Sequence, residues 1–245
     1  MQWPALRNSW DFDAMTKYSS KLLNKHEVAK ETLAFDLARP DELVFAAGQY
    51  MQVFLSDDAY DSHTFSIASA PHENVVTFAT RIRPGSDFKQ RLLKLAIGEE
   101  ITFEAAGGSV TLPKDKKQPI VFLIGGIGIT LARSMLRHMT HTKDTRHLWL
   151  FFSNRRREDT PFFDEMSKLA LPHFSFIPTM TGENHLWAGG RGYIDEKMIR
   201  RYVDGVSNSA FYVVGPPQFT EGMLKVLDTM SIPSRNIKSE DYGGY

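Results

Sequence analysis

From about residue 17 to residue 113, apolar and polar residues alternate along the chain. Val76 and Phe78 fall on one face of an extended segment, whereas Thr77 and Arg81 fall on the other. The same alternation recurs in two further runs, at 51–55 and 101–103. Because these runs are short and are separated by Gly, Pro, Asp and Asn, they predict an antiparallel sheet closed into a barrel.

One helix is expected within this barrel region. Phe88, Leu92 and Leu95 lie at positions i, i+4 and i+7, which is the spacing of one helical face. Either Ser86 or Asp87 can serve as its N-cap, because both side chains accept a hydrogen bond from a free backbone N–H of the first turn.

The pattern changes after a charged joint at 113–117. Apolar runs then alternate with helical ones. The expected strands are 120–124, 148–152, 174–177 and 210–214, and the expected helices are 130–140, 162–170, 195–203 and 219–230. This order predicts a doubly wound α/β domain with a parallel sheet. The chain therefore reads as a β-barrel domain at 17–113 and an α/β domain at 118–245, after an arm or expression remnant at 1–16.

Composition narrows the class of protein. The 245 residues are 42% hydrophobic and 24% charged, which is ordinary for a globular chain. Lys and Arg (29) balance Asp and Glu (29), which argues against a nucleic-acid partner. Cysteine is absent, which excludes disulfides and cysteine-ligated zinc or iron–sulfur centres in these residues. The longest uncharged run, 118–132, is shorter than the roughly 20 residues of a membrane span. A polar start without a signal peptide makes the cytoplasm the expected location.

The glycines at the end of the first parallel strand are the main candidate for ligand binding. Gly125, Gly126 and Gly128 follow an apolar run and precede a helical pattern. Glycine there lets backbone N–H groups approach a phosphate beside the positive end of the helix. Leu131 occupies the third glycine position of the G-x-G-x-x-G fingerprint, so the loop alone is a weak signal for a dinucleotide.

Two further loops are expected at the same edge of the sheet. Ser153 and Arg155 follow the second strand, where an arginine can accept the 2′-phosphate of NADPH. The same run, with Glu158 nearby, is also compatible with a solvated basic turn. Gly215 and Pro216 follow the fourth strand and form a fixed turn before a helix. Ligands of open α/β sheets bind outside the carboxyl ends of the strands, where all three loops are expected.

A motif in the barrel region, taken together with these loops, points to one kind of binding site. The run His63-Thr64-Phe65-Ser66 stands about 55 residues before the glycine loop, and Gly-Pro-Pro follows at 215–217. In this order the motifs resemble the ferredoxin–NADP reductase family, in which a flavin-binding barrel precedes a pyridine-nucleotide domain. The flavin motif is closer to the variant of ferric reductases and NADPH oxidases. The resemblance covers about residues 17–245.

The resemblance implies a role for each matching residue. His63 would lie at the FAD pyrophosphate, Phe65 against the isoalloxazine ring, and Ser66 beside flavin N5. The other implied cofactor contacts are Thr64, Thr80 and Arg81 along the flavin, Gly85 and Ser86 at the FAD phosphates, Gly126, Gly128 and Thr130 at the NAD(P)H pyrophosphate, Ser153 and Arg155 at the 2′-phosphate, and Gly215 and Pro216 near the nicotinamide.

The C-terminal residues match the family as well. Tyr242 or Tyr245 would cover the flavin face opposite the barrel, and Glu240 would assist proton delivery. Ser66, Glu240 and Tyr242 are therefore the expected catalytic residues. Two departures stand out: Val214 replaces a cysteine that packs near the nicotinamide, and Leu131 replaces a proline.

On this basis the expected activity is an NAD(P)H oxidoreductase. Electrons would pass from NADPH, or NADH, through FAD to a separate acceptor such as ferredoxin, flavodoxin or an oxygenase component. The expected enzyme is a monomer without a metal ion, a membrane or nucleic acid as partner. One alternative is a ferric-chelate or free-flavin reductase. Another, suggested only by Val214, is a nucleotide-sensing module without turnover.

Overall fold

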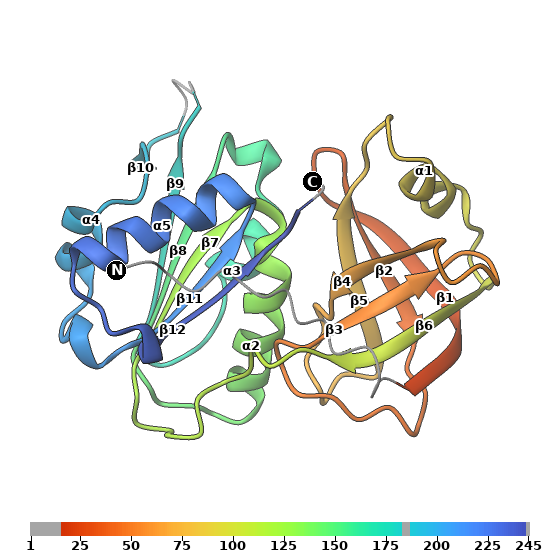
Figure 1. Ribbon diagram of the computed structural model, residues 1–245, viewed down its shortest axis with the longest axis horizontal. Coiled ribbons are helices and arrows are strands. Elements are labelled where there is room, and N and C mark those ends of the chain that lie inside the picture. The colour runs from red at the N-terminus through yellow and green to blue at the C-terminus, as the bar shows by residue number, and fades with distance from the viewer. Residues whose placement is uncertain (1–15, 183–186, 244–245) are drawn as a thin grey trace.

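The computed structural model describes residues 16–182 and 187–243 and contains two domains side by side (Figure 1). The predicted lid residue Tyr245 lies outside these ranges. So does the predicted arm at 1–16, apart from Thr16, where the first strand begins. None of the helices in the described ranges is long and apolar enough to cross a membrane.

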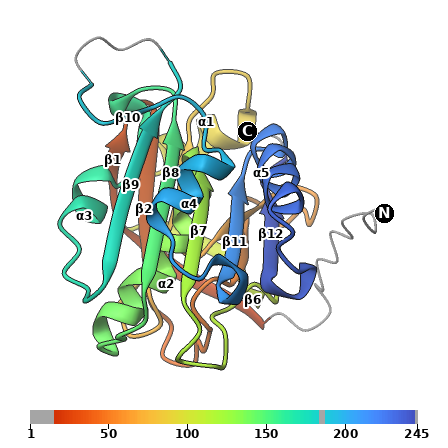
Figure 2. The same cartoon turned by 90° about the vertical axis from the view of Figure 1, so that its left-hand side faces the viewer.

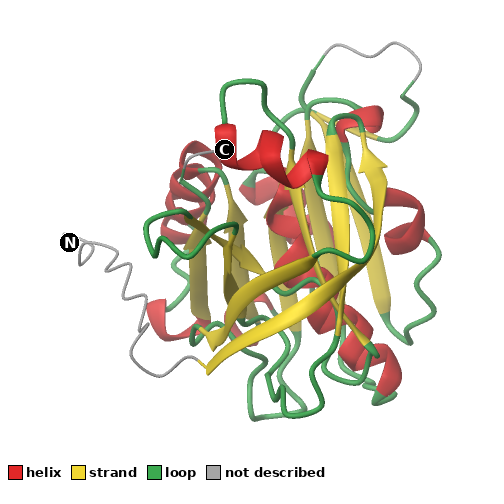
Figure 3. Cartoon of the chain, turned by 90° about the vertical axis from the view of Figure 1, so that its right-hand side faces the viewer, coloured by secondary structure: helices red, strands yellow, loops and turns green. Residues whose placement is uncertain are grey.

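The first domain is an antiparallel barrel, as the alternation predicts. Its strands are β1 (Thr16–Ala29), β2 (Thr32–Ala38), β3 (Tyr50–Phe54), β4 (Ser62–Ser66), β5 (Val75–Arg81) and β6 (Glu100–Gly107). They pair in the order β4-β3-β6-β1-β2-β5. The segment after β4 meets β5 where Ala68 N–H donates to the Thr77 carbonyl at 2.7 Å, which brings the two edges of the sheet together. Figure 3 shows the molecule from the side of this domain.

Inward-facing residues of the barrel form one apolar core. Val76 and Phe78 are fully buried, and the ring of Phe78 stacks on Phe35 at 4.9 Å, which confirms the predicted inward face of this strand. Helix α1 (Asp87–Lys94) lies at one end of the barrel and buries Phe88 and Leu92. Its N-cap is Ser86, one of the two predicted residues.

The second domain is a parallel sheet flanked by helices. Its strands are β7 (Ile120–Gly125), β8 (Leu148–Asn154), β9 (Phe174–Met180), β10 (Gly190–Arg191), β11 (Ala210–Gly215) and β12 (Ile237–Asp241), in the order β10-β9-β8-β7-β11-β12. The main helices are α2 (Ile129–His141), α3 (Phe163–Ser167), α4 (Glu196–Tyr202) and α5 (Pro217–Thr229). Figure 2 shows α4 and α5 over one face of the sheet, whereas α2 lies between the sheet and the barrel (Figure 1).

Two features of this domain differ from the sequence-based expectation. No strand is predicted at 237–241, but these residues form β12, which extends the sheet beside β11. Every residue of β12 is partly exposed, so this edge strand has no apolar run to reveal it. Helix α3 ends at Ser167, short of the predicted 170. Pro172 disfavours helical geometry at the residue before it, and the chain leaves the helix ahead of that point.

The strand order gives a topological switch point at the carboxyl edge of the sheet, which is where open α/β sheets form a crevice. From β7 the chain adds β8, β9 and β10 on one side of β7, and it then returns to add β11 and β12 on the other side. The strand order therefore reverses at β7. The loops after β7 and β11 therefore lie next to each other and lead away to opposite faces.

The two domains share a continuous apolar interface. Ala34 and Ala79 of the barrel belong to the same buried cluster as Met135 and Leu136 of α2. The linker between the domains is also fixed, because the Thr111 carbonyl accepts hydrogen bonds from the Tyr212 hydroxyl at 2.6 Å and from Lys238 Nζ at 2.8 Å. Packing and the linker together hold the two domains in one arrangement.

Candidate functional site

The loops after β7 and β11 touch through their backbones. A Cβ on Gly128 would lie 2.5 Å from the Val214 carbonyl oxygen, and one on Gly215 would lie 3.1 Å from Gly125 Cα. Gly126 has φ +53°, a left-handed conformation that side-chain-bearing residues rarely adopt. The glycines therefore allow a close contact between the loops and leave backbone N–H groups at the crevice.

Two helices begin at this edge of the sheet. α2 starts at Ile129, directly after the loop, and α5 starts at Pro217, with Pro216 as its N-cap. The predicted ligand Thr130 is buried, and its hydroxyl donates to the Ile127 carbonyl at 3.0 Å. Thr130 thus supports the shape of the loop, while the helix N-termini supply positive potential for an anion.

Ser153 and Arg155 lie beside the glycine loop. Ser153 is in register with Gly125, because β7 and β8 pair along their whole length. Arg155 follows one residue after β8 ends and is exposed. Its guanidinium forms no ion pair with any residue in the described ranges, so it is available to an anionic ligand.

The two arginines after Arg155 are engaged within the fold. Arg156 pairs with Glu158 at 3.7 Å. Arg157 pairs with Asp164, and its guanidinium lies 3.7 Å from the ring centroid of Phe163. Among the described residues, Arg155 is thus the one arginine of 155–157 whose guanidinium has no ion-pair partner, a distinction that the sequence does not reveal.

Ser66 is the point at which the barrel meets the C-terminal tail. Its hydroxyl forms a hydrogen bond with the Tyr242 hydroxyl. The Tyr242 N–H in turn donates to the Gly215 carbonyl at 3.0 Å. Residues far apart in the sequence, predicted to share a site, are therefore joined in one place between the domains.

Phe65 and His63 point to the other side of β4. Phe65 is in register with the core residue Met51, exposes 3% of its surface and stacks on Phe78 at 4.8 Å. It offers no free ring face here, so its stacking on a flavin stays a prediction and would require the ring to leave the core. His63 stacks on Phe88 at 4.2 Å.

The charge state of His63 is set by its surroundings. Burial is the main cause that lowers the pKa of His63, and the positive charge of Lys89 lowers it further. A hydrogen bond with the Ser62 carbonyl, 2.8 Å from Nδ1, acts in the opposite direction. His63 is therefore neutral at pH 7, with Nε2 left as an acceptor.

The residues predicted along the flavin chain lie apart. Thr64 is half-buried and sits opposite Gln52, on the face of β4 away from the core. Thr80 is fully buried on the core face, and its hydroxyl has no hydrogen-bond partner in the part of the chain that the structure describes. Arg81 forms an ion pair with Glu31 at 2.9 Å. None of these three side chains is already oriented to contact a flavin, so their roles stay predictions.

A positive cluster lies at the N-terminus of α1. Gly85 and Ser86 lead into the helix, and the Lys89 N–H donates to Ser86 Oγ at 3.4 Å. Lys89 exposes 2% of its surface; burial lowers its pKa to about 8, and the charge of Arg83 adds to that effect. A buried lysine beside an arginine and a helix N-terminus favours an anion at this point. The sequence alone groups Lys89 with Arg81, Arg83, Arg91 and Lys94 in one basic run, which is compatible with a solvated face that makes one or two flavin-phosphate contacts.

Arg91, in the same basic run, is already paired. Its guanidinium contacts both carboxylate oxygens of Asp61. These bonds, with one from Ser56, lower the pKa of Asp61 to about 2. Arg91 therefore ties α1 to the loop before β4, while Lys89 and Arg83 supply the positive charge.

Glu240 lies in β12 opposite Val214 of β11. Burial raises its pKa to about 7, and the negative charge of Asp241 adds to that effect. Its carboxyl group forms no hydrogen bond or ion pair with another described residue. A carboxyl that titrates near neutral pH beside the Gly215 loop can give or take a proton there.

A hollow in the surface lies away from these residues. It has a volume of about 470 Å³ and is lined by residues of β9, β10 and α4, including Trp187, Arg191 and Tyr202. None of the predicted site residues lines it. Within the described ranges no group of three or more His, Cys, Asp or Glu side chains is arranged to hold a metal ion.

Comparisons with known proteins agree with this architecture. Residues 122–225 match the family model described as an oxidoreductase NAD-binding domain. The reductase component of propane 2-monooxygenase from Mycolicibacterium goodii is 27% identical over 206 residues, covering 81% of this chain and 59% of that protein. The chain thus spans less than two thirds of that relative.

Two solved structures share the fold over most of the chain. The cytochrome P450 reductase GcoB of Amycolatopsis superimposes with a TM-score of 0.82 and 22% identity, covering 93% of this chain and 70% of that one. A ferredoxin NADP+ reductase of Neisseria gonorrhoeae, with bound FAD and NADP, gives 0.80 and 18%, covering 92% and 98%. The predicted two-domain fold is confirmed.

Proposed function

We propose that this chain is a ferredoxin–NADP reductase-like oxidoreductase that takes a hydride from NADPH with the help of bound FAD and passes electrons to a separate protein. The observation that carries this proposal is the junction of Ser66, Tyr242 and Gly215. It joins the barrel, the tail and the nucleotide crevice at one point. A hydride donor held by one domain can there meet an acceptor held by the other.

The residues of the barrel fit FAD at its phosphate end. Lys89, Arg83 and the N-terminus of α1 form a positive site for the pyrophosphate, with Gly85 and Ser86 at its entrance. Ser66 would face the reacting edge of the ring. Bound FAD would supply two-electron uptake and one-electron release, which no side chain can provide.

The α/β domain fits a pyridine dinucleotide. Gly126 and Gly128 keep the loop open to the pyrophosphate, and the N-terminus of α2 stabilises its charge. Ser153 and Arg155 would bind the 2′-phosphate, which gives the preference for NADPH over NADH. Val214 stands where many relatives have cysteine and leaves an apolar wall near the nicotinamide.

Two other residues would act on the substrate pair. Tyr242 lies over Ser66 and would move aside when the nicotinamide enters. Glu240, with a pKa of about 7, would exchange a proton at neutral pH beside the same loop. NADPH supplies a hydride, and full reduction of bound FAD would take up one proton in addition, which Glu240 would donate.

The electron acceptor follows from chemistry and from the relatives. These 245 residues contain no cysteine, so they hold no cysteine-ligated iron–sulfur centre. Curated relatives include reductase components of propane 2-monooxygenase and of terephthalate 1,2-dioxygenase. We therefore propose an oxygenase component, or a small electron carrier that serves it, as the partner, and the cytoplasm as the location.

An anaerobic titration of the FAD-loaded protein tests this function. NADPH should bleach the flavin absorbance rapidly, and NADH should do so more slowly. Arg155→Ala should remove that difference, whereas Arg156→Ala, which removes a guanidinium already paired with Glu158, should keep it. A protein that cannot bind FAD, or whose flavin is not reduced, would refute the proposal. Rapid turnover with ferric chelates or free flavin, with no gain from an oxygenase component, would favour the alternative reductase.

A further inference from the structure

The segment directly after Ser66 is bound to the barrel through its N–H groups. The Ile67 N–H donates to the Gln49 carbonyl at 2.9 Å, and the Ala68 N–H donates to the Thr77 carbonyl at 2.7 Å. Within the barrel, these bonds fix the backbone that carries Ser66.

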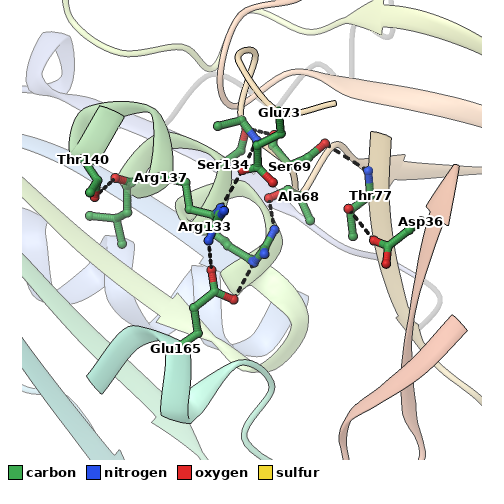
Figure 4. A network of polar contacts seen from close by, with 12 residues as sticks. Asp36, Ala68, Ser69, Glu73, Thr77, Arg133, Ser134, Arg137, Thr140 and Glu165 are labelled. Atoms are coloured by element: carbon green, nitrogen blue, oxygen red, sulfur yellow. Dashed lines mark hydrogen bonds and ion pairs between the residues drawn. The ribbon is translucent and has the colours of Figure 1, made fainter. Parts of the chain in front are cut away.

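The carbonyl groups of the same segment are bound to the other domain. Arg133 Nη1 donates to the Ala68 carbonyl at 2.8 Å, and the Ser134 hydroxyl donates to the Ser69 carbonyl at 2.7 Å (Figure 4). Both donors lie on α2, and Ser134 is fully buried. Residues 67–69 thus form a strip of backbone that is hydrogen-bonded on one side to the barrel and on the other to the nucleotide domain.

Arg133 is itself held in a fixed orientation. Its Nε donates to Glu165 Oε2 at 2.8 Å, and its guanidinium lies 4.8 Å from the ring centroid of Phe162. The side chain is 11% exposed. Glu165 also accepts a bond from Arg137 at 2.9 Å, so its carboxylate is shared by two guanidiniums (Figure 4). A planar guanidinium with partners on three sides is a stiff connection rather than a flexible one.

The position of Arg133 connects the two halves of the proposed reaction. It lies one turn into α2, whose first residue, Ile129, follows the glycine loop directly. On the other side its bond reaches Ala68, two residues after Ser66. The route from the dinucleotide loop to the flavin-side hydroxyl therefore runs through one helical turn, one side chain and two residues of backbone.

We propose that Arg133 is a positioning residue: through its bond to the Ala68 carbonyl it sets the distance between the nicotinamide bound at the α2 loop and the flavin bound at Ser66. This inference rests on the proposed function. Hydride transfer is steep in donor–acceptor distance, and misplacement of about 1 Å can cost on the order of 100-fold in rate. Loss of the bond should therefore slow the transfer step without weakening the binding of either cofactor.

The test is single-turnover reduction of the FAD-loaded protein by NADPH, followed anaerobically by stopped flow. Arg133→Met keeps an unbranched apolar stem but removes the guanidinium and both of its hydrogen bonds. It should lower the limiting reduction rate at least tenfold, while the dissociation constants of FAD and NADPH change less than twofold. Arg133→Lys can still reach the Ala68 carbonyl with one donor and should recover part of the rate.

Arg137→Met is the matched control. Arg137 lies one turn further along α2, pairs with Glu165 and with Glu73, and makes no bond to residues 67–69. Its loss removes an equal charge from the same interface, so the reduction rate should stay within twofold of the wild type. An equal loss of rate in both arginine variants would mean that general interface stability, not positioning, is responsible.

Other outcomes separate this inference from the proposed function. If wild-type flavin is not reduced by NADPH, the proposed function fails. If the wild type is reduced and Arg133→Met is equally fast, or if it loses FAD affinity in parallel with rate, the positioning role is refuted. Should Arg133→Met not fold, Ser134→Ala removes only the neighbouring bond to Ser69 and should slow reduction about threefold with binding intact; an unchanged rate there also refutes the role.

Discussion

The basic side chains near α1 differ in burial and in their ion pairs. Arg81 and Arg91 form ion pairs with Glu31 and Asp61, whereas Lys89 is withdrawn from water and lies near the positive charge of Arg83. A lysine whose pKa is lowered by burial opposes folding in its charged form at neutral pH. An FAD phosphate bound at this point would lower that cost, because it would stabilise the charged form of the lysine.

Lys89→Met should therefore stabilise the FAD-free protein and weaken FAD binding. The folded pKa of about 8 lies below the usual 10.5, so the cost is largest below pH 8 and disappears as the pH rises above 10.5. We expect a higher melting temperature at pH 7 and at least a tenfold larger FAD dissociation constant, measured by thermal denaturation and fluorescence titration. Lys94→Met, on the exposed last turn of α1, should change neither. Unchanged FAD affinity in Lys89→Met would contradict the assigned phosphate site.

Glu240 predicts the opposite dependence of stability on pH. Its folded pKa of about 7 lies above the usual 4.5, so its favourable contribution is complete below pH 4.5 and is lost as the pH rises through 7. Glu240→Gln should remove that loss and be more stable than the wild type at pH 8 by roughly 1–3 kcal/mol. Urea denaturation at pH 5 and pH 8 measures both values. Equal pH dependence in the two proteins would show that Glu240 titrates normally.

At the scale of elements, the glycine loop and the β11 loop depend on each other. A methyl group on Gly128 would overlap the Val214 carbonyl at 2.5 Å, where Val214 is held in β11 and Gly128 in the turn that leads into α2. The neighbouring helix α5 contains Gly222, where a methyl group would meet nothing within 4 Å. The two glycines therefore offer opposite tests of the same substitution.

Gly128→Ala should destabilise the protein by about 1–3 kcal/mol, because the loops must separate, and should reduce NADPH affinity. Gly222→Ala should raise stability by up to about 1 kcal/mol, since alanine is the better helix former, and leave NADPH binding unchanged. Chemical denaturation and titration calorimetry compare the pair. Normal NADPH binding in Gly128→Ala would remove the β7 loop from the site.

The elements that the sequence predicts well are those with local signals. The apolar run before Gly125 fixes β7, and the glycines fix the loop after it. β12 lacks such a signal, because all its residues are partly exposed and its sequence shows no alternation of apolar and polar residues. Phe65 shows a different limit of prediction from sequence. The alternation places Phe65 and Ser66 on opposite faces of β4, but only the pairing of Phe65 with Met51 shows which face lies toward the core. The Arg133 bond to Ala68 depends on how two domains meet, which no local pattern encodes.

At the scale of the whole molecule, the interface is part of the core. Ala34 and Ala79 are small residues on neighbouring barrel strands, and they let α2 and Phe162 pack closely against that wall. The backbone adds to this contact, since the Lys30 N–H donates to the Glu158 carbonyl at 2.8 Å. An interface that joins two cores in this way should make the domains unfold together rather than one after the other.

Calorimetry should therefore show one unfolding transition for the wild type, with matching calorimetric and van't Hoff enthalpies. Ala79→Asp places a charge in the shared cluster, where Ala79 is buried, and the interface must open to hydrate it. The variant should show two transitions, one for each domain, and should reduce its flavin slowly even at saturating NADPH because the two cofactors no longer meet. Ala59→Asp, on an exposed loop of the barrel, should keep one transition and the wild-type rate. Two transitions in the wild type itself would show that the domains are thermodynamically independent, and alignment of the cofactors would then have to come from the ligands rather than from the shared core.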